Sequence, residues 1–175
     1  MKVKKLLYPM LAAAMLLALS SCVSSGKVVE TVFDPSVPES RSAKILFWLD
    51  VETYNGIDVR EAWGKDNNIP LVTIPQGEAA FTFTAYFARD YGRTIYRYTI
   101  SDCDFRYKFE GGREYTVRWF LEKKPKKFLA VQEYNYYIQI YGRLPKDLQD
   151  SNYSDLKESD LLTQIFIFDT EDYKN

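Results

Sequence analysis

The sequence predicts an all-β protein, folded as an antiparallel two-sheet β-sandwich of about seven strands with one or two short helical turns near the C-terminus. Three observations predict this fold. Apolar and polar residues alternate with a period of two over most of the chain after residue 43. Aromatic residues make up 16% of the 175 residues, and 14 residues are Tyr, a type that strands favour. Turn-forming sequences separate the alternating segments at short intervals.

Residues 1–21 are predicted to be a lipoprotein signal peptide. Three of the first five residues are Lys, and residues 6–19 are nearly all apolar. This apolar segment is shorter than the roughly 20 residues that span a bilayer, and it fits the core of a secretory signal. The sequence Leu19-Ser20-Ser21-Cys22 resembles the bacterial lipobox, whose Cys is acylated and becomes the first residue of the mature protein. The alternative is an ordinary signal peptide in which Cys22 has no special role.

The lipobox resemblance implies a location. Two or more acyl chains of the palmitate type on Cys22 would hold the protein stably at a membrane. In bacteria with two membranes, an Asp after the lipidated Cys commonly retains a lipoprotein at the inner membrane, whereas Val23 stands here. We therefore expect a lipid-anchored protein of the bacterial cell envelope, at the outer membrane, with the membrane as its partner through Cys22.

The mature chain is predicted to have two parts. Residues 22–42 are rich in Ser, Val and Pro and show no periodicity, which indicates a flexible tether. Residues 43–175 are expected to form a single β-sandwich domain. The formal net charge of −1 gives no basic surface for nucleic acid. The basic cluster of residues 123–127 is expected in a hairpin loop, where it keeps a sheet edge soluble or contacts anionic polymers.

Strands are expected where the alternation is regular, at residues 45–49, 81–87, 95–100, 103–109, 115–121, 129–141 and 164–168. The clearest local prediction is a hairpin in which Asp104–Glu110 pairs with Glu114–Glu122. Gly111-Gly112 would form its turn, because adjacent glycines supply the positive φ that tight hairpins require. Short helical turns are expected at Pro145–Gln149 and from Ser154 onward.

Two turn segments behind the lipobox carry a family resemblance. Residues 72–78, Val-Thr-Ile-Pro-Gln-Gly-Glu, lead into an alternating strand, and residues 109–117 place a Tyr and β-branched residues after a glycine turn. Together they resemble small bacterial lipoproteins with a transthyretin-like or carboxypeptidase-regulatory-like β-sandwich. The resemblance covers residues 43–141. It implies the fold, and it supplies neither a ligand nor site residues.

The composition excludes several kinds of catalytic and metal site. The chain has no His, so it has no Ser-His-Asp triad, no Cys-His pair and no imidazole-based zinc site. Once Cys22 is lipidated, Cys103 is left without a disulfide partner. We expect Cys103 to be a small buried apolar residue, with a pKa raised by Asp102 and Asp104. The expectation is therefore a non-catalytic protein with no cofactor and no metal.

Asp102 and Asp104 are the best chemical candidates in the sequence. Two residues apart on a strand, they would point to one side, where paired carboxylates can bind Ca²⁺ or act as acid and base on a glycoside. The simpler interpretation is a solvated strand face on which Arg106 and Lys108 neutralise the carboxylates. A small envelope hydrolase that uses Asp and Glu is thus the least favoured function.

An aromatic binding surface is the preferred candidate site. Tyr134 and Tyr136 share one face of a strand, and Tyr137 and Tyr141 share the other, so one pair must lie outside the core. Exposed Tyr and Trp rings bind sugars or protein partners. The candidate residues are Trp48, Trp119, Tyr134, Tyr136, Tyr137 and Tyr141. The favoured function is a binding or scaffolding module for an envelope protein, with a glycan-binding module as the alternative.

Overall fold

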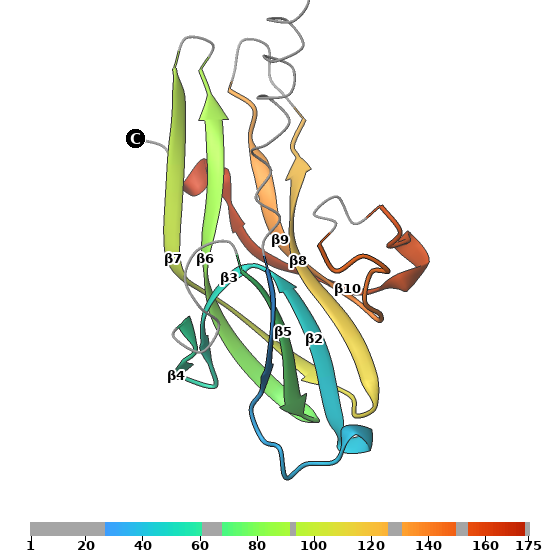
Figure 1. Ribbon diagram of the computed structural model, residues 1–175. Helices are drawn as coiled ribbons and strands as arrows, with labels where there is room; N and C mark the ends of the chain where they lie inside the picture. The colour runs from blue at the N-terminus through green and yellow to red at the C-terminus, as the bar shows by residue number, and fades with distance from the viewer. Residues whose placement is uncertain (1–26, 61–67, 92–93, 126–130, 150–153, 174–175) are drawn as a thin grey trace, which may run out of the picture.

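Two β-sheets packed face to face make up the protein (Figure 1). The computed structural model describes residues 27–60, 68–91, 94–125, 131–149 and 154–173, so the predicted signal peptide and Cys22 lie outside the described residues. Sheet A has the strand order β1 (Val28–Val32), β5 (Ile69–Pro75), β2 (Ser42–Trp48), β8 (Arg113–Lys123), β9 (Tyr134–Tyr141) and β10 (Leu161–Asp169). Sheet B has the order β4 (Ile57–Asp58), β3 (Asp50–Tyr54), β6 (Gly77–Asp90) and β7 (Ile95–Phe109).

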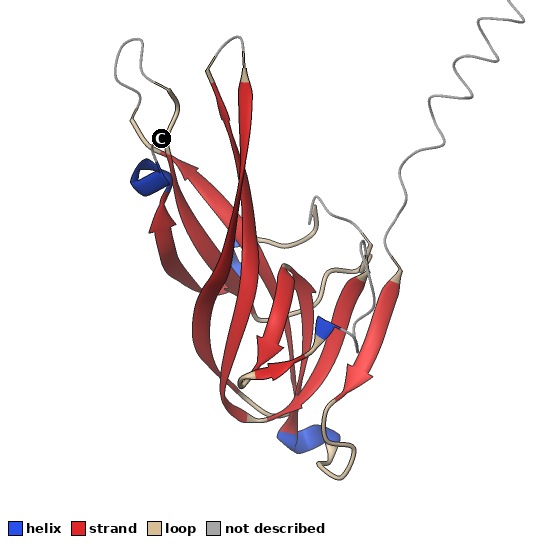
Figure 2. Ribbon diagram, turned by 90° about the vertical axis from the view of Figure 1, so that its left-hand side faces the viewer, coloured by secondary structure: helices blue, strands red, loops and turns tan. Residues whose placement is uncertain are grey.

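The predicted fold class is confirmed. The described residues contain ten strands rather than about seven, and their helical residues are Arg60 and the 3-10 turns η1 (Glu39–Arg41), η2 (Glu158–Asp160) and η3 (Thr170–Tyr173) (Figure 2). Most strand pairs are antiparallel, whereas β1–β5 and β2–β8 are parallel. Two helical turns are expected from the sequence. Pro145–Gln149 is not helical, and the segment that begins at Ser154 becomes helical only at η2.

The predicted hairpin across Gly111-Gly112 is wrong. Strand β7 pairs with β6 in sheet B, and β8 pairs with β2 and β9 in sheet A. Residues 110–112 therefore cross from one sheet to the other. The alternation on either side of the glycines is the same for a hairpin and for a crossover, because Phe109 and Tyr115 point into the core in both. Here their rings meet from opposite sheets at a centroid distance of 5.0 Å.

Part of the predicted tether is a strand. Val28–Val32 adds to the edge of sheet A by pairing with β5, with Val28 opposite Ile69. Lys44 on β2 forms an ion pair with Glu30 at 3.0 Å. The β-branched residues of this segment suit an extended edge strand, and β5 offers an open edge to receive it. The folded domain therefore includes residues that the sequence assigned to a linker, while residues 22–26 lie outside the described part.

Aromatic side chains fill the space between the sheets. Phe47 from β2 and Phe81 from β6 are at most 1% exposed, and their ring centroids lie 4.9 Å apart. The other aromatic residues of this core that are at most 2% exposed are Phe83, Phe105, Phe109, Tyr115 and Tyr136. Each lies at an inward position of a period-two strand, which explains why the sequence predicts a sandwich so clearly.

Gly111 marks the tightest approach between the sheet-crossing segment and the start of β2. A Cβ at this position would lie 2.6 Å from the Ser40 carbonyl oxygen and 2.8 Å from the Arg41 Cα. We predict that Gly111→Ala lowers the free energy of unfolding by about 1–3 kcal/mol, because backbone atoms cannot yield to the new methyl group. Chemical denaturation monitored by Trp fluorescence measures the change.

Gly142→Ala is the matched control for this prediction. Its Cβ would meet only side-chain atoms of Leu162, at 3.2–3.3 Å, and a flexible side chain can move aside. We expect a clearly smaller loss of stability. Equal stability of Gly111→Ala and the wild type would show that residues 110–112 do not pack against Ser40, and would contradict the crossover.

Candidate functional site

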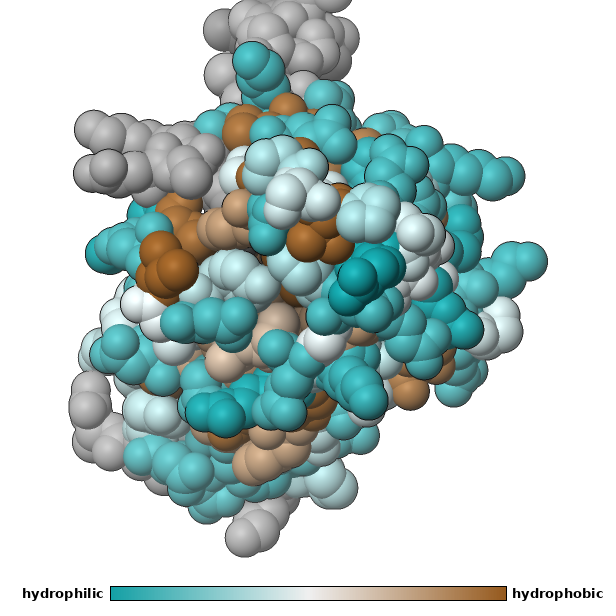
Figure 3. Space-filling model, turned by 90° about the horizontal axis from the view of Figure 1, so that it is seen from below, coloured by the Kyte–Doolittle hydropathy of each residue, from teal (hydrophilic) through white to brown (hydrophobic). Residues whose placement is uncertain are grey.

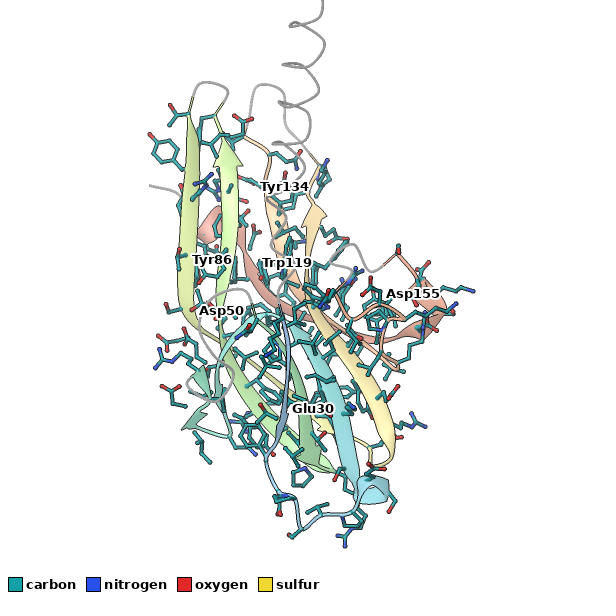
Figure 4. The ribbon with its side chains drawn as sticks, in the orientation of Figure 1. Glu30, Asp50, Tyr86, Trp119, Tyr134 and Asp155 are labelled. Atoms are coloured by element: carbon teal, nitrogen blue, oxygen red, sulfur yellow. The ribbon has the colours of Figure 1, made fainter. Side chains whose placement is uncertain are left out.

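The six predicted aromatic residues do not form one surface. Tyr136 is 2% exposed and stacks on Phe168 in the core at a centroid distance of 4.8 Å. Trp119 lies on the same side of sheet A as the core residues Tyr115 and Val117, yet it is 47% exposed. Tyr134 is half-buried at the start of β9. Figure 4 labels Trp119 and Tyr134 on β8 and β9. These three residues thus belong to the core side of sheet A.

Trp48 and Tyr141 lie on the outer side of sheet A, where residues of a loop join the apolar cluster that holds Trp48. Trp48 packs against a second apolar cluster formed by Leu46, Ile69 and Leu71, together with Val28, Leu144 and Leu148. Tyr141 is 4% exposed. The loop after β9 contributes Leu144 and Leu148 to the cluster, so this part of the outer side serves as a second core. Nothing in the residue pattern indicates that a non-strand segment covers a sheet face.

Arg143 holds this loop together. Its Nε lies 2.8 Å from an Asp160 carboxylate oxygen, and its Nη2 lies 3.2 Å from a carboxylate oxygen of Asp155. The hydrogen bond from Arg143 lowers the pKa of Asp160 below its usual value. Asp155 lies in the segment that extends away from the sheets beside β10 (Figure 4). The loop is therefore tied to the start of β10 and stays over the Trp48 cluster.

Half-buried Tyr137 and exposed Phe166 form an aromatic pair on the remaining outer side of sheet A. Phe166 is 55% exposed, and its ring meets that of Tyr137 edge to face at a centroid distance of 5.6 Å. The two residues are directly opposite each other on β9 and β10. Sequence reasoning named Tyr137 and missed Phe166. The signal was present, because Phe166 alternates with Ile165 and Ile167, which pack against the core.

A row of polar side chains runs beside this pair across three strands. Arg118 on β8 donates to Gln139 Oε1 at 2.9 Å and to the Tyr141 hydroxyl at 2.6 Å. The amide of Gln139 donates in turn to Gln164 Oε1 on β10 at 2.8 Å. The Arg118 guanidinium also lies over the Tyr141 ring, 4.9 Å from its centroid. Each member restrains its neighbour, so the row is ordered before any ligand arrives.

Glu122 extends the polar row past the aromatic pair. One of its oxygens accepts hydrogen bonds from the Tyr137 hydroxyl at 3.1 Å and from the Asn135 amide at 3.2 Å. Burial and the bond to Glu122 raise the pKa of Tyr137, so its hydroxyl stays protonated at neutral pH. We call the set of Arg118, Glu122, Tyr137, Gln139, Gln164 and Phe166 the polar–aromatic face. It combines an apolar ring surface with fixed donors and acceptors.

Cys103 behaves as the sequence predicts. It is 8% exposed, and its thiol lies 3.6 Å from the Ile100 carbonyl oxygen. Burial raises the pKa of the thiol to about 11, and the charges of Asp104 and Asp102 add to the shift. At neutral pH the group is a thiol rather than the nucleophilic thiolate, so Cys103 is an unreactive core residue.

The two aspartates that flank Cys103 are exposed. Asp102 has a φ of 59° and lies where the β6–β7 register shifts, so β7 is one bulged strand instead of the two that were expected. In the part of the chain that the structure describes, no group of three His, Cys, Asp or Glu side chains could hold a metal ion. Seen from below, the molecule is mostly hydrophilic, with its apolar residues in small separate patches (Figure 3).

The comparisons with family models, curated proteins and solved structures found no match to this chain. Within the described residues, no helix is long and apolar enough to cross a membrane.

Proposed function

We propose that the protein is a lipid-anchored, non-catalytic component of the bacterial cell envelope that acts as a binding or scaffolding module. The polar–aromatic face is the proposed binding surface. The observation that carries this proposal is the pair of exposed Phe166 and half-buried Tyr137 beside the hydrogen-bonded row from Arg118 to Gln164. Ordered polar groups around an aromatic centre that loses its water on binding are typical of surfaces where a few residues supply most of the binding energy.

The lipid anchor rests on the sequence, and the structure adds a limit to its reach. Strand β1 begins at Val28, six residues after Cys22. Six residues span at most about 21 Å when fully extended. A lipidated Cys22 therefore keeps the sandwich within roughly that distance of the bilayer, much closer than a flexible segment up to residue 42 would allow. This geometry favours a partner that is itself in or next to the membrane.

We predict that Cys22→Ala moves the protein from the membrane fraction to the soluble fraction of cell extracts, since the acyl chains are its proposed anchor. Quantitative immunoblots of the two fractions measure the change. Cys103→Ala is the matched control, because it removes a buried cysteine that carries no lipid and should leave the protein in the membrane fraction. Membrane retention of the Cys22→Ala protein would contradict lipid anchoring.

A glycan is the alternative ligand of the same face. An aromatic ring can stack on the apolar side of a sugar, while the amides and the carboxylate bind its hydroxyl groups. The face contains Phe166 and Tyr137 as rings and Gln139, Gln164 and Glu122 as hydrogen-bonding groups. A glycan hydrolase is less well supported. It needs two carboxylates across the substrate, whereas Glu122 is the only carboxylate among the six residues that define the face.

The binding surface can be tested by site-specific cross-linking in living cells. We predict that a photo-reactive amino acid at position 166 gives a discrete cross-linked product, because Phe166 is the exposed ring of the proposed contact. The same substitution at Tyr86 is the control. Tyr86 is 54% exposed on the outer side of sheet B and donates a hydrogen bond to Asp50 at 2.7 Å (Figure 4).

Affinity for the captured protein, or for isolated cell-wall glycan, is then measured with Phe166→Ser. Loss of the aromatic centre is expected to weaken binding about tenfold or more, whereas Tyr86→Ser should leave the affinity unchanged. Protein and glycan ligands are distinguished by which material binds. Cross-links from position 86 and none from position 166 would place the binding surface on sheet B and reject the polar–aromatic face.

A further inference from the structure

Arg89 is a buried cation at the end of the core. It is 1% exposed and follows the core residue Phe87 on the inward side of β6. The turn η3 contacts both the β6–β7 hairpin and β9: Tyr173 of this turn packs on Phe87 at a centroid distance of 6.2 Å, and the Tyr134 N–H donates to the Thr170 hydroxyl. Arg89 Nη1 donates a long hydrogen bond of 3.4 Å to the Tyr173 carbonyl oxygen. Aromatic residues of the hairpin and η3 thus enclose the guanidinium.

One edge of this guanidinium has no partner among the described residues. Nε and Nη2 are both buried, and neither makes a hydrogen bond in that part of the chain. Among the described residues, no carboxylate forms an ion pair with Arg89. The remaining interaction is with the Tyr98 ring, whose centroid lies 5.6 Å from Arg89 Cζ. The Nε–Nη2 edge presents two parallel N–H donors, which is the arrangement that holds a carboxylate or a phosphate through two bonds.

Burial of this charge is costly for the isolated protein. An arginine cannot shed its proton at any physiological pH, so it cannot escape the cost by becoming neutral. An unpaired buried charge is strongly destabilising, and a single ring contact and one long hydrogen bond offset only part of that cost. An apolar side chain of similar length would suit the same position better. Among the described residues nothing supplies a negative charge at this position, which points to a partner from outside them.

We propose that Arg89 binds the oxyanion of a ligand, a carboxylate or a phosphate, through its Nε–Nη2 edge. The nearby rings indicate the rest of the ligand. Tyr96 lies directly opposite Arg89 in the β6–β7 register and is 52% exposed. Tyr91 is 46% exposed, and its ring meets that of Tyr96 edge to face at 5.3 Å. Exposed rings beside a buried cation suit a ligand with an apolar or aromatic body and one acidic group.

This site is separate from the polar–aromatic face. The face lies on the outer side of sheet A, whereas Arg89 lies on the inner side of sheet B, beneath η3. Tyr173 covers the guanidinium, so a ligand must displace part of this short turn to reach it. A negative result at one site therefore leaves the proposal for the other site standing, and the two proposals can be tested independently.

Thermal unfolding of the full-length protein tests the proposal. Wild type, Arg89→Met and Arg97→Met are compared in anion-poor buffer, with inorganic phosphate and with benzoate. Arg97 is the matched control, because it is an exposed arginine on the same hairpin. We expect Arg89→Met to unfold at the same temperature as the wild type or higher in anion-poor buffer, since it removes an unpaired buried charge.

The response to anions is the second readout. Phosphate or benzoate should raise the Tm of the wild type and of Arg97→Met saturably, by about 5 °C near saturation, and leave Arg89→Met unchanged. A response to phosphate alone indicates a phosphorylated ligand, and a response to benzoate alone indicates an aromatic carboxylate. Three results overturn the proposal: a lower Tm of Arg89→Met in anion-poor buffer, an anion response that persists in Arg89→Met, or no saturable response of the wild type to either anion.

Discussion

The fold depends on the place where three chain segments meet at the start of β2. The Gln76 N–H donates to the Arg41 carbonyl and the Gly112 N–H donates to the Ser42 carbonyl, both at 2.8 Å. The buried Tyr115 hydroxyl accepts a hydrogen bond from the Glu110 N–H at 2.9 Å, an arrangement similar to the tyrosine corner of other sandwiches. These bonds fix the β5–β6 and β7–β8 crossovers side by side. Both crossovers join the two sheets, so these hydrogen bonds set how the sheets stack on each other.

Both proposed sites follow from that stacking. The β7–β8 crossover places β8 between β2 and β9, so its alternate residues enter the core or reach the outer side, where Arg118 begins the polar row. The β6–β7 hairpin belongs to the other sheet. Its strands have 14 and 15 residues, so they extend beyond the part of the core in which the aromatic rings pack tightly. Arg89 occupies the last inward position of β6, beside η3 and the Tyr98 ring.

Alternation predicted the class of fold and strands such as β2, β6 and β8, because burial on one side of a strand is a local property of the sequence. Pairing is not local. The parallel β2–β8 pair joins residues 70 positions apart, with Ile45 opposite Tyr115, and no turn signal identifies such a partner. The same limit applies to Trp48, which a distant loop covers. Phe166 could have been found from its alternation with Ile165 and Ile167. The burial of Arg89 could not have been predicted from the sequence, because a charged residue at an inward position normally marks the end of a core.

The strand pairing of β8 is the most direct test of this account, and backbone nuclear Overhauser effects measure it. The account predicts contacts between backbone protons of β2 and β8 in parallel register, with Ile45 near Tyr115 and Phe47 near Val117. Side-chain contacts between Phe109 and Tyr115 are expected in either arrangement and decide nothing. Backbone contacts between β7 and β8 in antiparallel register, with Glu110 opposite Glu114 and Phe109 opposite Tyr115, would show a hairpin across Gly111-Gly112 and contradict the crossover.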